Sequence, residues 1–225
     1  MEWPRDAEEL VAEQQRLGRL RPRSWSPEAR PATVGAVFVC FPRGAPIPGA
    51  ADDRAWAAAV VLRKRTEVSW ATATGRAGGP YVPGLLALRE GPALAAAVRR
   101  LEVVPEVLLV NATGRDHPRR AGLALHLGYV LDLPTIGVTD RPLVAEGAEP
   151  GPGRGDTAPL VVGNDLVGYR LRSRAGARPI VVHAAWRTAP EVAVAVVRTG
   201  LRRARTPEAL RRARRSARRA RASAR

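Results

Sequence analysis

Residues Glu106 to Gly128 read EVLLVNATGRDHPRRAGLALHLG, which joins an apolar run to a polar, glycine-containing turn and then to a second apolar pattern with helical periodicity. This order predicts a buried strand at Val107 to Val110, followed by a loop and a helix. Ligands in α/β folds bind beyond the carboxyl ends of such strands. The site predicted at this position includes Asn111, Gly114, Asp116 and His117.

Similar patterns on both sides of this segment predict a mixed sheet. Apolar runs and alternating patterns predict strands at 33–41, 55–62, 66–74, 134–138, 160–162, 166–171 and 180–183. Helical spacing and helix-start signals predict helices at 6–20, 92–101, 119–131, 190–202 and 207–221. Three strands therefore come first, and helices and strands alternate after them. We expect an α/β domain whose sheet begins antiparallel and continues with parallel strand–helix–strand units.

Positive charge is concentrated at the end of the chain. The net charge is +16 over 225 residues, and residues 201–225 alone hold eleven arginines against one acid, Glu208. A basic surface favours a polyanionic partner, because side chains that neutralise phosphates release bound counterions. Lys64 is the only lysine, and Ala, Arg, Gly and Pro are abundant, so GC-rich codon usage is an alternative source of the arginines. We expect a domain at residues 1–202 and an arginine-rich tail at 203–225, whose helix is too polar to pack as core.

Composition excludes several classes of protein. No apolar run in the sequence reaches the roughly 18 residues that span a bilayer. Cys40 is the only cysteine, which excludes an internal disulfide and a cysteine-rich zinc site. The first residues lack the basic-then-apolar pattern of a signal peptide. We expect a cytoplasmic monomer without a membrane partner.

A second segment, Gly79 to Glu90, reads GPYVPGLLALRE. Pro80 and Pro83 stiffen a turn and hold Tyr81 at its tip, with Val82 beside it. A rigid aromatic or proline side chain at such a tip can enter a base step and unstack it. Considered alone, a turn of this kind is more often only structural.

Taken together, the two segments resemble the endonuclease V family, whose members cut nucleic acids near deoxyinosine or inosine. The resemblance keeps the family's order and spacing over residues 79–138 and runs more weakly over 8–195. It implies an RNase H-like fold, Mg²⁺ or Mn²⁺ as cofactor, inosine-containing DNA or RNA as partner, and a hydrolytic cut one phosphodiester removed from the lesion. The matching pieces are Pro80-Tyr81-Val82-Pro83-Gly84, Arg89-Glu90, Pro92-Ala93-Leu94, Gly114, His117-Pro118-Arg119-Arg120, Gly122, Ala124, His126-Leu127-Gly128 and Asp132-Leu133-Pro134-Thr135-Ile136-Gly137-Val138.

The resemblance also implies roles for individual residues. The turn at 80–83 opens the duplex, the glycine loops and His117 line a pocket for the flipped base, and two arginines hold phosphates. The implied nucleic-acid-binding set is Pro80, Tyr81, Val82, Pro83, Gly114, Arg119, Arg120 and Gly122, and the implied catalytic set is Glu90, Asn111 and His117.

The metal site departs from the family where carboxylates are needed. We call the turn at 80–83 the wedge. The family supplies an Asp on the first strand, a Glu after the wedge and an Asp at the end of the fourth strand. Only the Glu is matched, by Glu90, whereas Phe38 and Asn111 stand at the two Asp positions. Mg²⁺ prefers charged oxygen ligands; a phenyl ring provides none, and an amide provides an uncharged one. We expect a nucleic-acid-binding protein whose cleavage is lost or strongly impaired, and which then needs no metal cofactor.

Two alternatives stay open. In the first, the chain is an active Mg²⁺-dependent deoxyinosine 3′ endonuclease of DNA repair, with a shifted first strand or a metal site rebuilt from Glu90, Asn111, Asp116 and Glu191. Asp52 and Asp53 also follow the first strand, and we expect them to be solvated in a loop. In the second alternative, the fold serves only as a scaffold for interactions.

Further departures lie outside the metal ligands. The family's Gly-His-Gly is Ala112-Thr113-Gly114 here, its Lys falls on Asp140, and its late Gly-His-Arg is Ala185-Trp186-Arg187. We expect Trp186 to fill the space of the missing His, and Trp56 and Trp70 to pack in the core.

Overall fold

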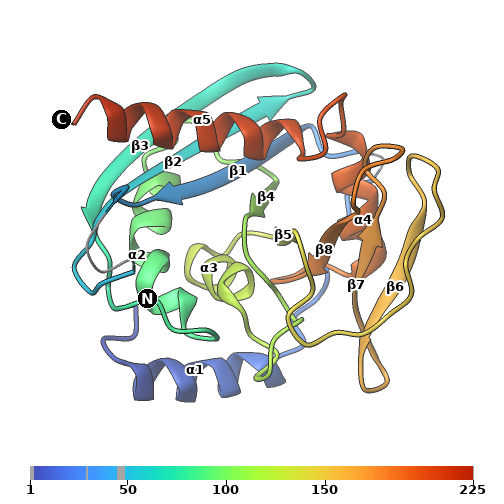
Figure 1. Ribbon diagram of the computed structural model, residues 1–225, viewed down its shortest axis with the longest axis horizontal. Helices are drawn as coiled ribbons and strands as arrows, with labels where there is room; N and C mark the ends of the chain where they lie inside the picture. Colours follow the sequence, from blue (N-terminus) through green and yellow to red (C-terminus); the bar gives the residue numbers. More distant parts are fainter. Residues whose placement is uncertain (1–2, 29, 45–48, 225) are drawn as a thin grey trace.

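An eight-stranded mixed sheet with five helices around it forms the protein, in a computed structural model that describes residues 3–28, 30–44 and 49–224 (Figure 1). The predicted α/β class is confirmed. The strands are β1 (Thr33–Cys40), β2 (Arg54–Arg63), β3 (Thr66–Arg76), β4 (Val107–Val110), β5 (Thr135–Thr139), β6 (Thr157–Val162), β7 (Asp165–Leu171) and β8 (Ile180–Ala184). The helices are α1 (Ala7–Arg19), α2 (Leu86–Arg99), α3 (Leu123–Leu131), α4 (Pro190–Thr199) and α5 (Glu208–Ala222).

The strands follow the order β3-β2-β1-β4-β5-β8-β7-β6. β1 and β4 are parallel, as are β4 and β5, whereas the other neighbouring strands are antiparallel. The predicted antiparallel start is therefore confirmed, and the predicted parallel continuation holds for β4 and β5, whereas β8, β7 and β6 return to antiparallel pairing. The carboxyl ends of β1, β4 and β5 meet at one edge of the sheet, where a ligand site is expected.

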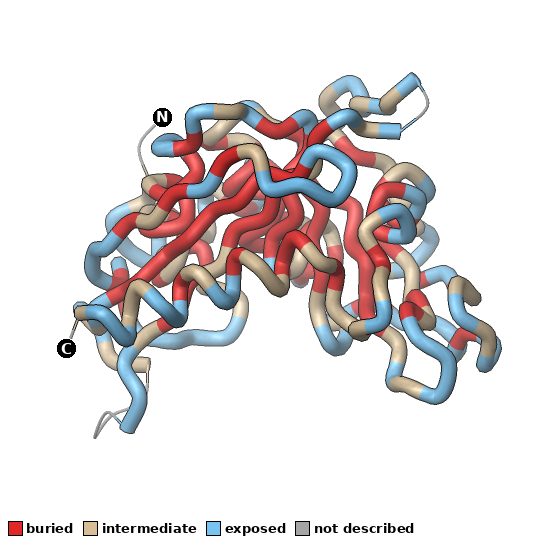
Figure 2. The backbone as a smooth tube through the Cα atoms, turned by 90° about the horizontal axis from the view of Figure 1, so that it is seen from above, coloured by how far each residue is buried: buried red, intermediate tan, exposed pale blue. Residues whose placement is uncertain are grey.

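Helices cover both faces of the sheet, and the strands alternate between them. One core cluster includes Val37 and Val39 of β1 with residues of α1, α2 and α3. Phe38 points the other way and packs with residues of α4 and α5. Figure 2 shows the buried residues running along the strands, with exposed residues on the outer sides of the helices. No helix among the described residues is long and apolar enough to cross a membrane.

Helix α5 packs against the sheet, so the prediction that this arginine-rich helix is too polar to pack was wrong. It lies along β1 and β2 (Figure 1) and buries Ala209, Leu210, Ala213 and Ala217. Three of these are alanines four residues apart, which places them on one face of a helix. Small side chains let the helix approach the strands closely while the arginines stay on its outer faces. Residues 208–222 are thus part of the folded domain rather than a separate tail.

Two helices begin several residues away from their predicted starts. α2 begins at Leu86 rather than at Pro92, so Glu90 lies inside the helix and Pro92 interrupts one backbone hydrogen bond within it. The apolar face of α2 packs on the sheet and carries the helix through the proline. α3 begins at Leu123 rather than at Arg119. Arg120 has a φ of +58°, a left-handed conformation that an α-helix cannot include.

Candidate nucleic-acid interface

A cavity of about 180 Å³ lies where the two motif segments meet. Its walls come from the turn before α2, the end of β4 and the loop before α3. The structure therefore brings together the segments that the sequence singled out at 79–90 and 106–128. The lining residues are Gln14, Tyr81, Val82, Pro83, Gly84, Leu86, Asn111, Ala112, Thr113, His117, Leu123, Thr139 and Leu143.

The turn at the mouth of this cavity presents exposed apolar side chains. Tyr81 is 60% exposed and Val82 is 39% exposed. The turn itself is held in place: the backbone N–H of Tyr81 donates to the Gly49 carbonyl at 2.7 Å, and Gly84 has a φ of +81°. An exposed aromatic ring on a fixed backbone is the geometry that the wedge role requires.

His117 connects this turn to the loop before α3. Its Nε2 lies 3.1 Å from the Gly84 carbonyl oxygen, and its Nδ1 accepts from the Arg119 backbone N–H at 3.2 Å. Nδ1 is therefore unprotonated, and Nε2–H donates to Gly84. Burial lowers the pKa of His117 to about 4, so the ring is neutral at physiological pH. In this position His117 fixes the turn and lines the cavity without adding a positive charge.

Arg119 and Gln14 complete the support of the same carbonyl. Arg119 donates through Nη2 to the Gly84 oxygen at 3.0 Å and through Nε to the Gln14 side-chain oxygen at 2.7 Å. The Gln14 amide donates to Gly84 as well, at 3.1 Å. Gln14 was missed in the sequence as a site residue because it falls in the helical stripe Leu10, Gln14, Leu17. The signal that could have found it is a polar side chain in an otherwise apolar stripe, since such a group needs a buried partner.

Other implied binding residues lie behind the cavity rather than in its wall. A Cβ on Gly114 would lie 2.1 Å from the Ala184 carbonyl oxygen, and one on Gly122 would lie 2.4 Å from that of Thr113. Both positions therefore need glycine for close packing of the loop. Arg120 points away from Arg119 and donates to the Val162 carbonyl at 2.7 Å.

Phe38 and Asn111, at the two positions where the family has aspartates, are neighbours. Val37 pairs with Val110 in the parallel register of β1 and β4; Phe38 follows Val37 in β1, and Asn111 follows Val110, the last residue of β4. Asn111 is exposed and lies in the cavity wall. Phe38 is half-buried, and the guanidinium carbon of Arg214 in α5 lies 5.5 Å from its ring centroid. The edge therefore offers one amide group and an aromatic ring facing a cation.

Glu90 is the remaining carboxylate of the family's set. Burial raises its pKa to about 7, although the neighbouring Arg89 favours the charged form. Among the described residues, no hydrogen bond or ion pair reaches the Glu90 carboxylate. Arg89 is directed to Asp53, at 2.6 Å, in an ion pair that is almost fully buried. The expectation that Asp53 is solvated was therefore wrong, because Arg89 provides it with a partner.

The other acids of the rebuilt-site alternative have different partners. Asp116 is completely buried, and its carboxylate accepts three backbone N–H groups, each at 2.8 Å, from Leu143, Val144 and Ala145. Glu191 is exposed in the first turn of α4 and accepts from the Tyr169 hydroxyl at 3.4 Å. In the ranges that the structure describes, no group of three or more His, Cys, Asp or Glu side chains could hold a metal ion. The donor set at this edge therefore does not fit Mg²⁺, which prefers several charged oxygens.

The tryptophans divide between core and surface. Trp56 is buried, as predicted, but Trp70 is 63% exposed on β3, so its predicted place in the core was wrong. Trp186 is buried, and its ring meets that of Tyr129 edge-on at 5.2 Å between centroids.

Comparison with known proteins places this geometry among relatives. The sequence profile of the family described as Endonuclease V matches residues 27–215. A curated relative, Endonuclease V of Streptomyces avermitilis, is 39% identical over 216 residues, which are 94% of this chain and 90% of the relative. The crystal structure of Endonuclease V from that organism has a TM-score of 0.87 at 39% identity and covers 99% of this chain and 96% of its own.

A DNA complex shares the fold. Ciona intestinalis Endonuclease V in complex with a 24mer DNA containing an inosine followed by a ribo-adenosine has a TM-score of 0.80 at 22% identity. The match covers 97% of this chain and 98% of that chain. The RNase H-like fold that the resemblance implied, a mixed sheet flanked by helices, is thus confirmed.

Proposed function

This chain belongs to the endonuclease V family, and we propose that it binds inosine- or deoxyinosine-containing nucleic acid with little or no cleavage of the strand. The single observation that carries the proposal is the pair Phe38 and Asn111, two uncharged residues that directly follow the register partners Val37 and Val110 of β1 and β4. The wedge and the cavity beside this edge are intact.

The wedge and the cavity together support the binding half of the proposal. Tyr81 is exposed and can stack in a base step, which opens the helix. A base that leaves the stack needs a pocket nearby, and the cavity under the turn lies directly behind Tyr81. Three donors fix the Gly84 carbonyl, so the turn keeps its shape when a base step is opened. The arginines on the outer faces of α5 add a sequence-independent attraction for phosphates.

The few groups available to hold a metal ion support the second half of the proposal, that the strand is cut little or not at all. A divalent cation in a phosphodiesterase site orients the attacking water and neutralises charge on the leaving oxygen. Glu90 would be the one carboxylate available to hold it, with the Asn111 amide oxygen as an uncharged second donor. Arg214 lies over the neighbouring Phe38 ring, and its positive charge opposes the approach of a second cation.

One observation favours an active nuclease as the second candidate. Among the described residues, the Glu90 carboxylate has no hydrogen-bond or ion-pair partner. Such a carboxylate is able to coordinate a metal ion. A phosphate oxygen of the nucleic acid could add one ligand but could not complete a site by itself, so this candidate requires a coordination set that also uses Glu90, Asn111 and water.

Binding and cleavage measured in parallel test the proposal. Oligonucleotides of DNA and of RNA, each with inosine or with guanine at one position, are incubated with the protein in Mg²⁺, Mn²⁺ or chelator. We expect inosine-selective binding in all three solutions and no cut product. Metal-dependent cutting that disappears in Glu90→Ala would favour the active nuclease instead. Equal binding of inosine and guanine strands, without cutting, would contradict both functions and favour a scaffold.

A further inference from the structure

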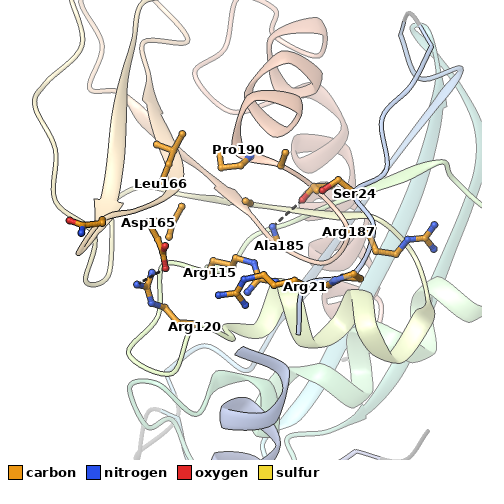
Figure 3. Close-up of a pocket in the computed structure, with 15 residues that line it drawn as sticks. Arg21, Ser24, Arg115, Arg120, Asp165, Leu166, Ala185, Arg187 and Pro190 are labelled. Atoms are coloured by element: carbon orange, nitrogen blue, oxygen red, sulfur yellow. Dashed lines mark hydrogen bonds and ion pairs between the residues drawn. The ribbon is translucent and has the colours of Figure 1, made fainter. Parts of the chain in front are cut away.

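A second hollow, of about 410 Å³, lies on the other side of the loop that carries His117. It shares no lining residue with the cavity behind Tyr81. Arg21 comes from the segment after α1, and Arg115 and Arg120 come from the loop before α3. Figure 3 shows these three side chains along one wall and Pro190, the first residue of α4, on the opposite wall. We call this hollow the arginine pocket.

The arginine pocket has more positive than negative charge. Asp165 is the one carboxylate among its lining residues, and it pairs with Arg120 at 3.1 Å. Arg21 and Arg115 donate only to uncharged acceptors, the carbonyl oxygens of Gly18 and Leu20 at the end of α1. Two guanidinium groups are therefore left without a carboxylate among the residues that the structure describes.

Arg115 is affected by its burial and by the two neighbouring cations. Burial, together with the positive charges of Arg21 and Arg120, lowers its pKa to about 10. Arg115 is still charged at neutral pH, so the pocket contains mutually repelling cations. An anion between them would relieve this repulsion.

The opposite wall is the amino terminus of α4, where Ala189 provides no side-chain cap. Pro190 at the first helical position has no N–H to donate, and Glu191 in the first turn offsets the positive end of the helix dipole, so the attraction for an anion comes from the arginines. Arg187 also lines the hollow, and its guanidinium pairs with Asp132 at 3.4 Å. Capping of the carboxyl end of α1 accounts for the hydrogen bonds of Arg21 and Arg115, but it does not explain why three cations gather around one hollow.

We propose that the arginine pocket binds a phosphate group, held by Arg21, Arg115 and Arg120. Guanidinium groups match phosphate oxygens in charge and in the geometry of their paired donors. The phosphate comes either from a nucleic-acid strand that passes over the loop or from a free phosphate-bearing molecule. Phosphate binding here is separate from the inosine selectivity proposed above, because the two cavities have no residue in common.

Binding of inorganic pyrophosphate, followed by calorimetry at constant ionic strength, tests the pocket directly. The variants are Arg21→Gln and Arg115→Gln, and the matched control is Arg23→Gln, two residues along the same segment, exposed and outside the pocket. We expect the wild type and Arg23→Gln to bind equally, and Arg21→Gln to bind at least tenfold more weakly. Arg21 is exposed, so its variant keeps the test valid if Arg115→Gln does not fold.

The salt dependence of oligonucleotide binding distinguishes the two sources of phosphate. If the pocket takes a strand phosphate, Arg21→Gln reduces the slope of log K against log salt by about one relative to Arg23→Gln, and pyrophosphate competes with the oligonucleotide. If it takes a free molecule, the slope is unchanged and only pyrophosphate binding is weakened. The proposal is overturned if Arg21→Gln and Arg23→Gln agree in both measurements. Inosine selectivity is measured in the same titrations, so its loss or survival is scored separately.

Discussion

Phe38 and Asn111 directly follow a pair of register partners in two parallel strands: Val37 of β1 pairs with Val110 of β4, Phe38 comes after Val37, and Asn111 comes after Val110. The Arg214 guanidinium faces the Phe38 ring from α5. An aromatic ring with a cation above it and a neutral amide beside it form an edge that is well suited to a neutral or anionic group. It is poorly suited to a divalent cation.

Restoring the carboxylates should restore cation binding. We expect Phe38→Asp combined with Asn111→Asp to bind Mn²⁺ measurably by calorimetry, with no comparable binding by the wild type, since two charges join that of Glu90. Asn111→Asp alone should bind more weakly, because the ring and Arg214 still occupy the neighbouring position. Adding Glu90→Ala to the double variant should abolish the gain. A correctly folded double variant that binds no Mn²⁺ would contradict the assignment of these two positions.

Tyr81 should contribute to binding without contributing to stability. Its ring is 60% exposed, so Tyr81→Ala should leave the melting temperature nearly unchanged. Stacking of a base on an aromatic ring contributes about 1–3 kcal/mol, so the affinity for an inosine strand should fall by roughly 5- to 150-fold. Trp70→Ala, at a ring 63% exposed on β3, is the control and should retain wild-type affinity. Equal losses in the two variants would mean that exposed aromatic area, rather than the wedge, drives binding.

Glu90 should make stability depend on pH. Its pKa is about 7 in the folded protein against an ordinary 4.5, so the folded state keeps a proton that the unfolded chain has lost. The free energy of unfolding therefore falls as pH rises from about 4.5 to 7, and the loss is complete above that range. Glu90→Gln resembles the protonated form and should stabilise the protein by about 1–3 kcal/mol at pH 8, with little effect at pH 4. Urea unfolding at the two pH values measures this difference. Glu102→Gln, at an exposed position, should change neither value, and a gain in Glu90→Gln that is the same at both pH values would refute the mechanism.

Asp116 should be structural rather than catalytic. Replacement by Asn leaves one acceptor oxygen and places an N–H₂ group against the backbone donors of Leu143, Val144 and Ala145. We expect Asp116→Asn to lower the free energy of unfolding by about 2–4 kcal/mol, because buried donors lose a charged acceptor. Asp165→Asn is the matched control: that carboxylate is 62% exposed, and its loss should cost less than about 1 kcal/mol. An Asp116→Asn variant as stable as the control would reopen the question of a metal-binding role.

Local sequence determined the elements and the two segments that build the site. The run Val107–Val110 was predicted with its observed bounds, because burial on both faces of a parallel strand requires continuous apolar residues. The turn at Tyr81 and the absence of charge at Phe38 and Asn111 were also legible from residue types alone. These features depend on neighbours along the chain or on the chemistry of a single side chain.

Tertiary structure decided which partner each polar side chain has. The sequence gives Arg119 and Arg120 the same chemistry, yet one supports Gly84 and the other reaches Val162 and Asp165. Asp116 stood next to His117 as a candidate ligand, but its carboxylate accepts three backbone N–H groups from the loop at 143–145 and lies 3.5 Å from the His183 Nδ1. The alanines of α5 lie among many arginines in the sequence, and only the packing of the helix on β1 and β2 shows that they form its buried face. Periodicity is a local signal, so it determined the helices and strands. The hydrogen bonds and ion pairs join residues that are distant in the chain, so only the tertiary structure determined which side chains meet.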